Sequence, residues 1–161
     1  MSDLEDTRPY RPCVGLMLIN RDKQVFVGNR IDTPGDHWQM PQGGIDAGEE
    51  PAEAALRELA EEIGTGKARI IAESRDWFAY DLPVELSRRV WKGKYRGQTQ
   101  KWFLLCFDGE DADIRLDAHT QEFAAWRWAP LDRLQEMIVP FKRKIYGRVV
   151  AEFEPMIRNL P

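Results

Sequence analysis

Seven carboxylates surround a single arginine, Arg57, between positions 46 and 62 of the sequence. Glu61 and Glu62 lie three and four positions after Glu58, so a helix would place Glu58 beside both of them. Like charges at these spacings destabilise a helix by about 0.2–0.5 kcal/mol per pair, and a cation between them would reverse the sign. Carboxylate oxygens are the ligands that Mg²⁺ and Mn²⁺ prefer. The segment therefore predicts a divalent metal site on this face.

The acidic segment has the boundaries of a helix. Pro51 suits the first turn and Gly64 the C-terminal cap, which predicts a helix over residues 50–63. The positions expected to face the core form one stripe: Ala52, Ala55, Leu56, Leu59 and Ile63. A glutamate-rich helix is most often a solvated surface helix. Here the acids lie on one side, and a glycine loop brings backbone amides and carbonyls to the same face, which favours a functional site.

Eight positions of the segment resemble the Nudix box in residue type and spacing. They are Gly43, Glu49, Arg57, Glu58, Leu59, Glu61, Glu62 and Gly64. One position departs from the box, because Thr65 stands where a bulky aliphatic residue is usual. The resemblance implies a hydrolase that splits a nucleoside diphosphate linked to another group, by metal-assisted attack of water on phosphorus.

The resemblance also implies roles for individual residues. It makes Glu58, Glu61 and Glu62 ligands of two or more Mg²⁺ or Mn²⁺ ions, and Glu58 in addition the base that takes a proton from water. Glu122, before a strand-like aromatic run, fits the position of a further ligand, with a surface glutamate at a strand start as the less favoured alternative. The expected structural residues of the motif are Gly43, Glu49, Arg57 and Gly64.

Residues outside the box narrow the resemblance. From about residue 10 to residue 153 the chain is similar to the branch that contains bacterial RNA pyrophosphohydrolases and plant-type diadenosine tetraphosphate hydrolases. This similarity implies conversion of a 5′-triphosphate or diphosphate RNA end to a 5′-monophosphate, which opens messenger RNA to decay. Hydrolysis of diadenosine tetra- or pentaphosphate remains the alternative, because both substrates present a nucleoside 5′ polyphosphate.

Five residues are expected to bind that substrate. Arg11 and Arg30 flank the first hairpin, and a guanidinium can form paired hydrogen bonds with phosphate. Phe141 and Lys142 stand together at a helix start, where an aromatic face can stack on a base while the ammonium meets phosphate. Tyr80 is a candidate by resemblance. A role for Phe141 in the core is an equally good interpretation, because it lies on the apolar side of its helix.

A basic segment follows later in the chain. Residues 87–101 contain six cations, Trp91 and Tyr95, and no acid. This combination suits a single-stranded nucleic acid backbone, although it is also compatible with a solvated loop. It contrasts with the acidic residues 46–62, whose charge sum is -6 in a chain of net charge -4.

The remaining segments predict an α/β fold in one domain over residues 1–161. The resemblance implies the Nudix fold, a mixed β-sheet sandwiched between α-helices. Strands are expected at 13–19, 24–30, 68–74, 77–80, 102–107 and 123–129, with a short extended piece and glycine turn at 38–44 and a loop at 31–36. Helices are expected at 131–139 and from Pro140 until Pro155 ends the last one.

Composition limits the class of protein. The chain has 161 residues, of which 43% are hydrophobic and 31% charged, and it has no apolar run long enough for a membrane span. Its acidic, polar N-terminus lacks the pattern of a secretory signal. Cys13 and Cys106 lie in apolar runs, which suits reduced, buried thiols. We therefore expect a cytoplasmic enzyme with no membrane partner.

Overall fold

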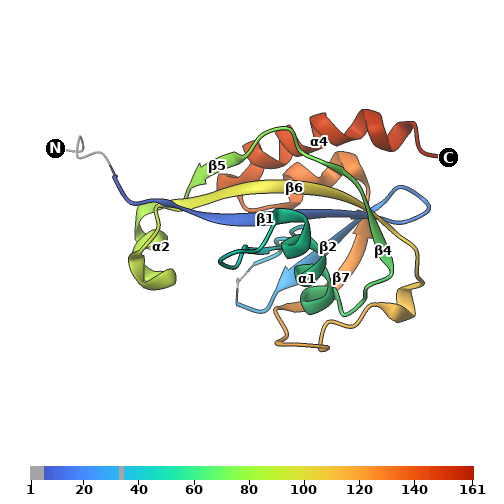
Figure 1. The fold of residues 1–161 in the computed structure, drawn as a ribbon, viewed down its shortest axis with the longest axis horizontal. Coiled ribbons are helices and arrows are strands. Elements are labelled where there is room, and N and C mark those ends of the chain that lie inside the picture. Colours follow the sequence, from blue (N-terminus) through green and yellow to red (C-terminus); the bar gives the residue numbers. More distant parts are fainter. Residues whose placement is uncertain (1–5, 33–34) are drawn as a thin grey trace.

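The computed structural model describes residues 6–32 and 35–161, so part of the expected loop at 31–36 lies outside the described residues. The described chain forms one seven-stranded mixed sheet with helices on both sides (Figure 1), which confirms the α/β expectation. The strands are β1 (Tyr10–Ile19), β2 (Val25–Arg30), β3 (Gln42–Gly44), β4 (Ala68–Glu73), β5 (Phe78–Asp81), β6 (Gly97–Phe107) and β7 (Phe123–Ala129). The α-helices are α1 (Pro51–Ile63), α2 (Val84–Arg89), α3 (Leu134–Met137) and α4 (Arg143–Arg158). Four 3₁₀ turns join them: η1 (Trp91–Gly93), η2 (Asp111–Asp113), η3 (Leu131–Arg133) and η4 (Pro140–Lys142).

The long strands β1 and β6 form the centre of the sheet. They run parallel, and their paired residues extend from Tyr10 opposite Gly97 to Ile19 opposite Cys106. The main strand order is β4-β6-β1-β2-β7, with β3 pairing to β1 and β5 pairing to β6. All pairings except β1 with β6 are antiparallel. The expected first hairpin is present as β1 and β2, and β1 begins three residues earlier than predicted.

The two faces of the sheet bury separate cores because successive side chains of a strand point to opposite sides. Leu16 and Phe103 pack in the core that includes residues of α1. Met17 and Trp102 pack in the core that includes residues of α4. Figure 1 shows α1 and α4 on opposite sides of the central strands.

Helix α1 has the predicted ends and a different buried face. Pro51 is its first residue, and Gly64 caps it with φ 77°, donating its N–H to the Ala60 carbonyl at 3.1 Å. The predicted stripe is wrong at two positions, because Ala52 and Leu56 are exposed. The buried residues of the helix are Ala54, Ala55, Glu58, Leu59, Glu62 and Ile63. The helix is rotated so that two glutamates, rather than Ala52 and Leu56, turn inward.

The glycines before α1 also differ from the prediction. Gly43 and Gly44 were expected in a turn, yet both lie in β3 and pair with β1 opposite Val14 and Cys13. The backbone requirement for a positive φ falls instead on Gly48, at 79°. The two strand glycines are needed for close approach of side chains from both sides, as described below.

The C-terminal helix continues past Pro155, so the expectation that this proline ends it is wrong. A proline inside a helix removes one backbone hydrogen bond and costs about 3 kcal/mol. Phe153 and Ile157, on either side of it and four residues apart, are both buried against the sheet. Their burial offsets the lost hydrogen bond for the last turn, which ends at Arg158.

The basic segment is more ordered than the sequence suggests. It contains the second half of α2 and the turn η1, neither of which was predicted, and β6 starts at Gly97 rather than Trp102. Within the part of the chain that the structure describes, no helix is long and apolar enough to cross a membrane.

Candidate active site

The short strand β3 separates two groups of functional side chains. A Cβ atom added at Gly43 would overlap the carboxylate of Glu58 on one side of the strand. A Cβ atom added at Gly44 would overlap the guanidinium of Arg11. Because neighbouring strand residues face opposite ways, the two glycines allow an acidic side chain, Glu58, and a cationic one, Arg11, to approach the same backbone from opposite faces.

Two of the predicted metal ligands are buried carboxylates. Glu58 is 9% exposed and Glu62 is 5% exposed. Burial raises the pKa of Glu58, against the opposing effect of Arg57. Burial raises the pKa of Glu62 well above its usual range, and the neighbouring carboxyl of Glu122 raises it further. In the described residues the Oε2 atom of Glu62 is buried and has no hydrogen-bond partner, which is costly for a carboxylate.

Arg57 holds the opposite side of this acidic cluster. It donates to both carboxylate oxygens of Glu49, from Nε at 2.8 Å and from Nη2 at 2.9 Å. Its Nη2 also donates to the Gly44 carbonyl at 2.8 Å. Its Nη1 donates to Glu58 at 2.9 Å and to Glu61 at 3.3 Å. One guanidinium therefore joins the strand, the loop and two of the acids.

Glu49 serves the loop in this arrangement. Besides its pair with Arg57, Glu49 accepts a hydrogen bond from the Asp46 backbone at 2.9 Å. The Arg57 guanidinium and this amide lower the pKa of Glu49 to about 2. Glu61, by comparison, retains a third of its side-chain exposure. Thr65, the departure from the motif, is buried, and its hydroxyl accepts a hydrogen bond from the Lys67 backbone at 3.0 Å.

Glu122 joins the cluster from a distant part of the chain. It lies directly before β7, and its side chain interacts with the buried Glu62. Arg30, at the end of β2, lies 3.5 Å from Glu122 and forms a 2.7 Å ion pair with Asp32. Pairing between β2 and β7 places Arg30 opposite Phe123 and so fixes this neighbourhood.

The chemistry of these residues fits a divalent metal ion. The unpartnered Glu62 oxygen is a ready ligand, and the close approach of Glu58 to Gly43 places a second carboxylate on the same helix face. Hard divalent ions favour such oxygen ligands. Among residues 6–32 and 35–161, no three His, Cys, Asp or Glu side chains are already grouped to hold an ion. Arg57 contacts one oxygen each of Glu58 and Glu61, so the second oxygen of each carboxylate lies outside these ion pairs.

The other side of β3 carries cations and aromatic rings. The Tyr80 and Phe141 rings lie 6.1 Å apart, and the Lys142 ammonium lies 6.0 Å and 5.9 Å from their centroids. Burial lowers the pKa of Lys142 to about 8, and the positive charge of Arg30 adds to the shift. Arg11 donates to the Cys13 thiol at 3.5 Å. The structure thus brings together four of the five predicted substrate residues, and Arg30 connects them with the acids.

A network of glutamine side chains beside these residues was not predicted from the sequence. Gln100 donates to Gln42 at 2.9 Å and to Gln98 at 2.8 Å, and accepts from the Trp102 indole at 3.0 Å. Gln98 and Gln100 are buried in β6. Their signal was the alternation of glutamine with other residues before Trp102, which places successive amides on one face of a strand. Near them, the buried hydroxyl of Tyr80 has no hydrogen-bond partner within the described chain.

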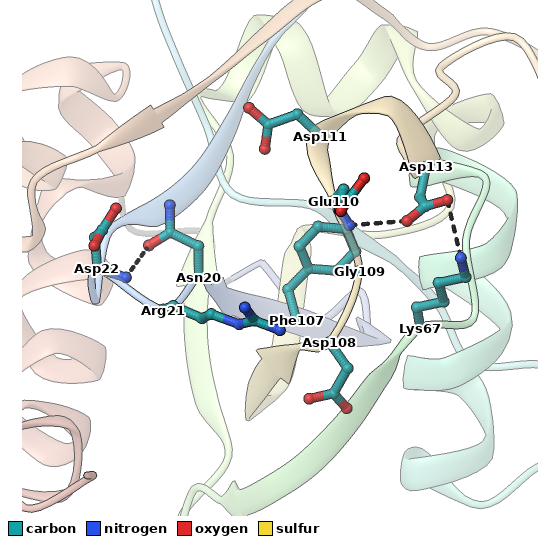
Figure 2. A pocket seen from close by; sticks show the side chains of 10 residues that line it. All are labelled: Asn20, Arg21, Asp22, Lys67, Phe107, Asp108, Gly109, Glu110, Asp111 and Asp113. Carbon is teal, nitrogen blue, oxygen red and sulfur yellow. Dashed lines mark hydrogen bonds and ion pairs between the residues drawn. The ribbon is translucent and has the colours of Figure 1, made fainter.

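A separate pocket lies at the opposite end of the central strands. It has a volume of about 480 Å³ and is lined by residues of the β1–β2 turn and of the segment after β6, including Asn20, Phe107 and Asp108. Figure 2 shows this pocket, with Asp113 held by Lys67 and by the Glu110 backbone. None of the predicted site residues lines it.

Comparisons with known proteins agree with this geometry. The model of the NUDIX domain family matches residues 9–149. This chain belongs to the NUDIX family. It is 54% identical over 154 residues to an RNA pyrophosphohydrolase from Sphingopyxis alaskensis, covering 94% of this chain and 98% of that protein. It is 54% identical over 150 residues to an RNA pyrophosphohydrolase from Rickettsia prowazekii, covering 93% of each.

The NUDIX fold is shared with solved structures of low sequence identity. The Ap4A hydrolase of C. elegans in a binary complex superposes with a TM-score of 0.69 at 20% identity, covering 93% of this chain and 99% of that one. At this identity the similarity establishes the fold. NUDIX hydrolases generally use divalent metal ions, so the acidic cluster also agrees with the family.

Proposed function

We propose that this NUDIX protein is a divalent-metal-dependent RNA 5′ pyrophosphohydrolase that acts in the cytoplasm. Water is added and the bond between the α- and β-phosphates is broken, so a 5′-triphosphate end yields pyrophosphate and a 5′-monophosphate. A 5′-diphosphate end yields orthophosphate in the same way. The observation that carries the proposal is the arrangement about β3, where buried carboxylates, one with an unpartnered oxygen, and the guanidinium of Arg11 approach one short strand from opposite faces. The 54% identity to RNA pyrophosphohydrolases supports the substrate.

The acidic side of β3 would hold Mg²⁺ or Mn²⁺. The ligands are Glu58, Glu61 and Glu62 from α1 and Glu122 from before β7. Bound divalent ions supply positive charge that neutralises phosphate oxygens and makes water easier to deprotonate. Glu58 accepts the proton of the attacking water, and burial raises the pKa of its carboxyl above the usual value. Arg57 and Glu49 hold the loop and Gly44 in place around these acids.

The cationic side would hold the nucleotide end. Arg11, Arg30 and Lys142 carry the positive charge that pairs with the phosphate chain. Tyr80 and Phe141 present aromatic surface to a base, and stacking on such a surface contributes about 1–3 kcal/mol per base. Fixing phosphates and base on one side of β3 presents the scissile bond to the acids on the other side.

A direct competition tests the proposal. The protein is given a 5′-triphosphorylated oligoribonucleotide and diadenosine tetraphosphate at equal concentration with Mg²⁺, and both products are quantified. We expect faster turnover of the RNA, no turnover with a chelator, and turnover of both substrates reduced by about 10²–10⁴-fold in the Glu58→Gln variant. Faster hydrolysis of the dinucleotide at both low and high salt would instead make this a dinucleoside polyphosphate hydrolase.

A further inference from the structure

The chain between β5 and β6 forms an arm of net positive charge, in which four exposed cations stand against one exposed acid, Glu85. This arm, residues 84–95, comprises α2, η1 and the residues that follow η1 (Figure 1). Its exposed cations are Arg88, Arg89, Lys92 and Lys94. Across residues 6–32 and 35–161, none of these four forms an ion pair, whereas most other arginines of the chain have an acidic partner. Four exposed cations close together in the chain give the arm a positive potential that attracts an anionic ligand.

Arg11 connects the arm with the other predicted substrate-binding residues. The Arg11 guanidinium lies over the ring of Trp91, 5.0 Å from its centroid. The same guanidinium contacts Gly44 of β3, on the strand that borders the acidic cluster. A cation–aromatic pair of this kind stabilises its geometry by about 0.5–2 kcal/mol. The arm therefore lies next to the residues that are predicted to bind the substrate.

The aromatic residues of the arm are held in one arrangement. Trp91 and Tyr95 contact edge to face, with centroids 6.0 Å apart, and Lys94 lies 5.5 Å from the Tyr95 centroid. Trp91 and Lys92 both have positive φ, at 48° and 58°. For residues other than glycine this conformation costs about 1–2 kcal/mol each, so surrounding contacts must hold it.

Arg8 supplies those contacts. Its Nη1 donates to the Gly93 carbonyl at 3.1 Å, and its Nη2 donates to the Ser87 hydroxyl at 2.9 Å. The Gly93 N–H in turn donates to the Val90 carbonyl at 2.9 Å. One side chain from the segment before β1 thus ties α2 to η1. The arm is a preformed surface, because hydrogen bonds hold its backbone and contacts between rings and cations hold its aromatic pair.

We propose that this arm binds the single-stranded RNA downstream of the 5′ end, with its cations on the phosphates and Trp91 and Tyr95 beside the bases. The inference rests on the proposed function and goes beyond it, because it assigns a second binding surface outside the cleft. Fixed aromatic rings between exposed cations can bind a single strand of any sequence, because the rings stack on any base and the cations contact the backbone phosphates. Each phosphate contact should also release counterions, so the contribution of the arm should decrease as salt increases.

The test compares substrates of two lengths. The ratio of kcat/KM is measured for a 5′-triphosphorylated oligoribonucleotide of about ten nucleotides and for a 5′-triphosphorylated dinucleotide, at several salt concentrations. The arm variant carries Arg88→Gln, Arg89→Gln, Lys92→Gln and Lys94→Gln. A control variant with the same change in net charge carries Arg21→Gln, Lys67→Gln, Arg69→Gln and Arg115→Gln, all exposed and outside the arm. Thermal melts verify that both variants fold.

We expect wild type to favour the longer RNA at low salt. The arm variant should lose about tenfold or more of that preference and most of its salt dependence, and the control variant should keep both. Retention of the preference by the arm variant, or equal loss in both variants, would overturn the inference. If wild type hydrolyses both RNAs with no length preference, the inference that the arm binds RNA is wrong and the proposed function is unaffected. Hydrolysis of neither RNA would overturn both.

Discussion

The two sides of β3 differ in how the fold treats their charges. On the acidic side, Glu62 is buried with an unpartnered oxygen, and Glu58 has Arg57 as its cationic partner. On the other side, Arg11 lies over the Trp91 ring and Lys142 lies against the rings of Tyr80 and Phe141. The buried Glu62 is therefore destabilised until a cation binds, and the basic side chains on the other side are available to bind an anion. A phosphate chain bound with divalent ions would satisfy both sides at once.

The largest effect expected from this contrast is on Glu58. Glu58→Gln removes the proposed proton acceptor and one proposed metal ligand, so kcat should fall by about 10²–10⁴-fold, the usual contribution of a general base. Melting temperature should stay the same or rise, because a buried carboxylate next to other acids is neutralised. Steady-state kinetics and thermal melts on the same preparation measure both. Preserved turnover would remove Glu58 from its role.

A single carbon atom added at either glycine of β3 should disturb only one side of the site. Gly43→Ala should push the Glu58 carboxylate away and lower kcat by about 10–100-fold, since small misplacements of reacting groups are costly. Gly44→Ala meets the flexible end of Arg11, so it should raise KM and leave kcat nearly unchanged. Michaelis–Menten analysis of the pair checks this division. Equal effects of both variants on kcat would mean that β3 does not divide the site.

The pH dependence of kcat/KM should reflect the titration of Lys142. Its pKa of about 8 in the free protein means that the ammonium is present below that pH and lost above it. Because kcat/KM reports groups of the free enzyme, it should fall above about pH 8, by up to about tenfold for one charge-assisted contact. Lys142→Arg keeps its charge and should flatten this decline. An identical decline in the arginine variant would assign the titration to another group.

The smallest effect concerns the outward face of α1. Leu56 is 46% exposed, so Leu56→Ala should change the free energy of unfolding by no more than about 0.5 kcal/mol. Leu59 on the buried face is the matched control, and Leu59→Ala should cost about 2–5 kcal/mol. Urea denaturation measures both. A large loss for Leu56→Ala would restore the stripe predicted from the sequence.

The sequence was sufficient for the elements whose signals are local. Pro51 and Gly64 predicted both ends of α1, and the run from Phe123 to Ala129 predicted β7. It was insufficient where tertiary packing competes with local preference. Hydrophobicity places Leu56 inside and Glu62 outside, and the structure reverses them. Burial of Ile157 likewise carries α4 past Pro155.

The site shows the same division between local and long-range information. The spacing of Glu58, Glu61 and Glu62 is a local signal and placed the acids on one helix. The approach of Glu122 to Glu62 depends on the pairing of β2 with β7, which no spacing in the sequence specifies. The contact between Arg11 and Trp91 similarly depends on the parallel pairing of β1 with β6.

The most direct test of the central claim is a crystal of the protein soaked with Mn²⁺ and a nonhydrolysable 5′-triphosphorylated RNA analogue. The account predicts anomalous density within coordination distance of the Glu58 and Glu62 carboxylates, and phosphates between those sites and Arg11. Density elsewhere, with both carboxylates still unliganded while the analogue is bound, would contradict it.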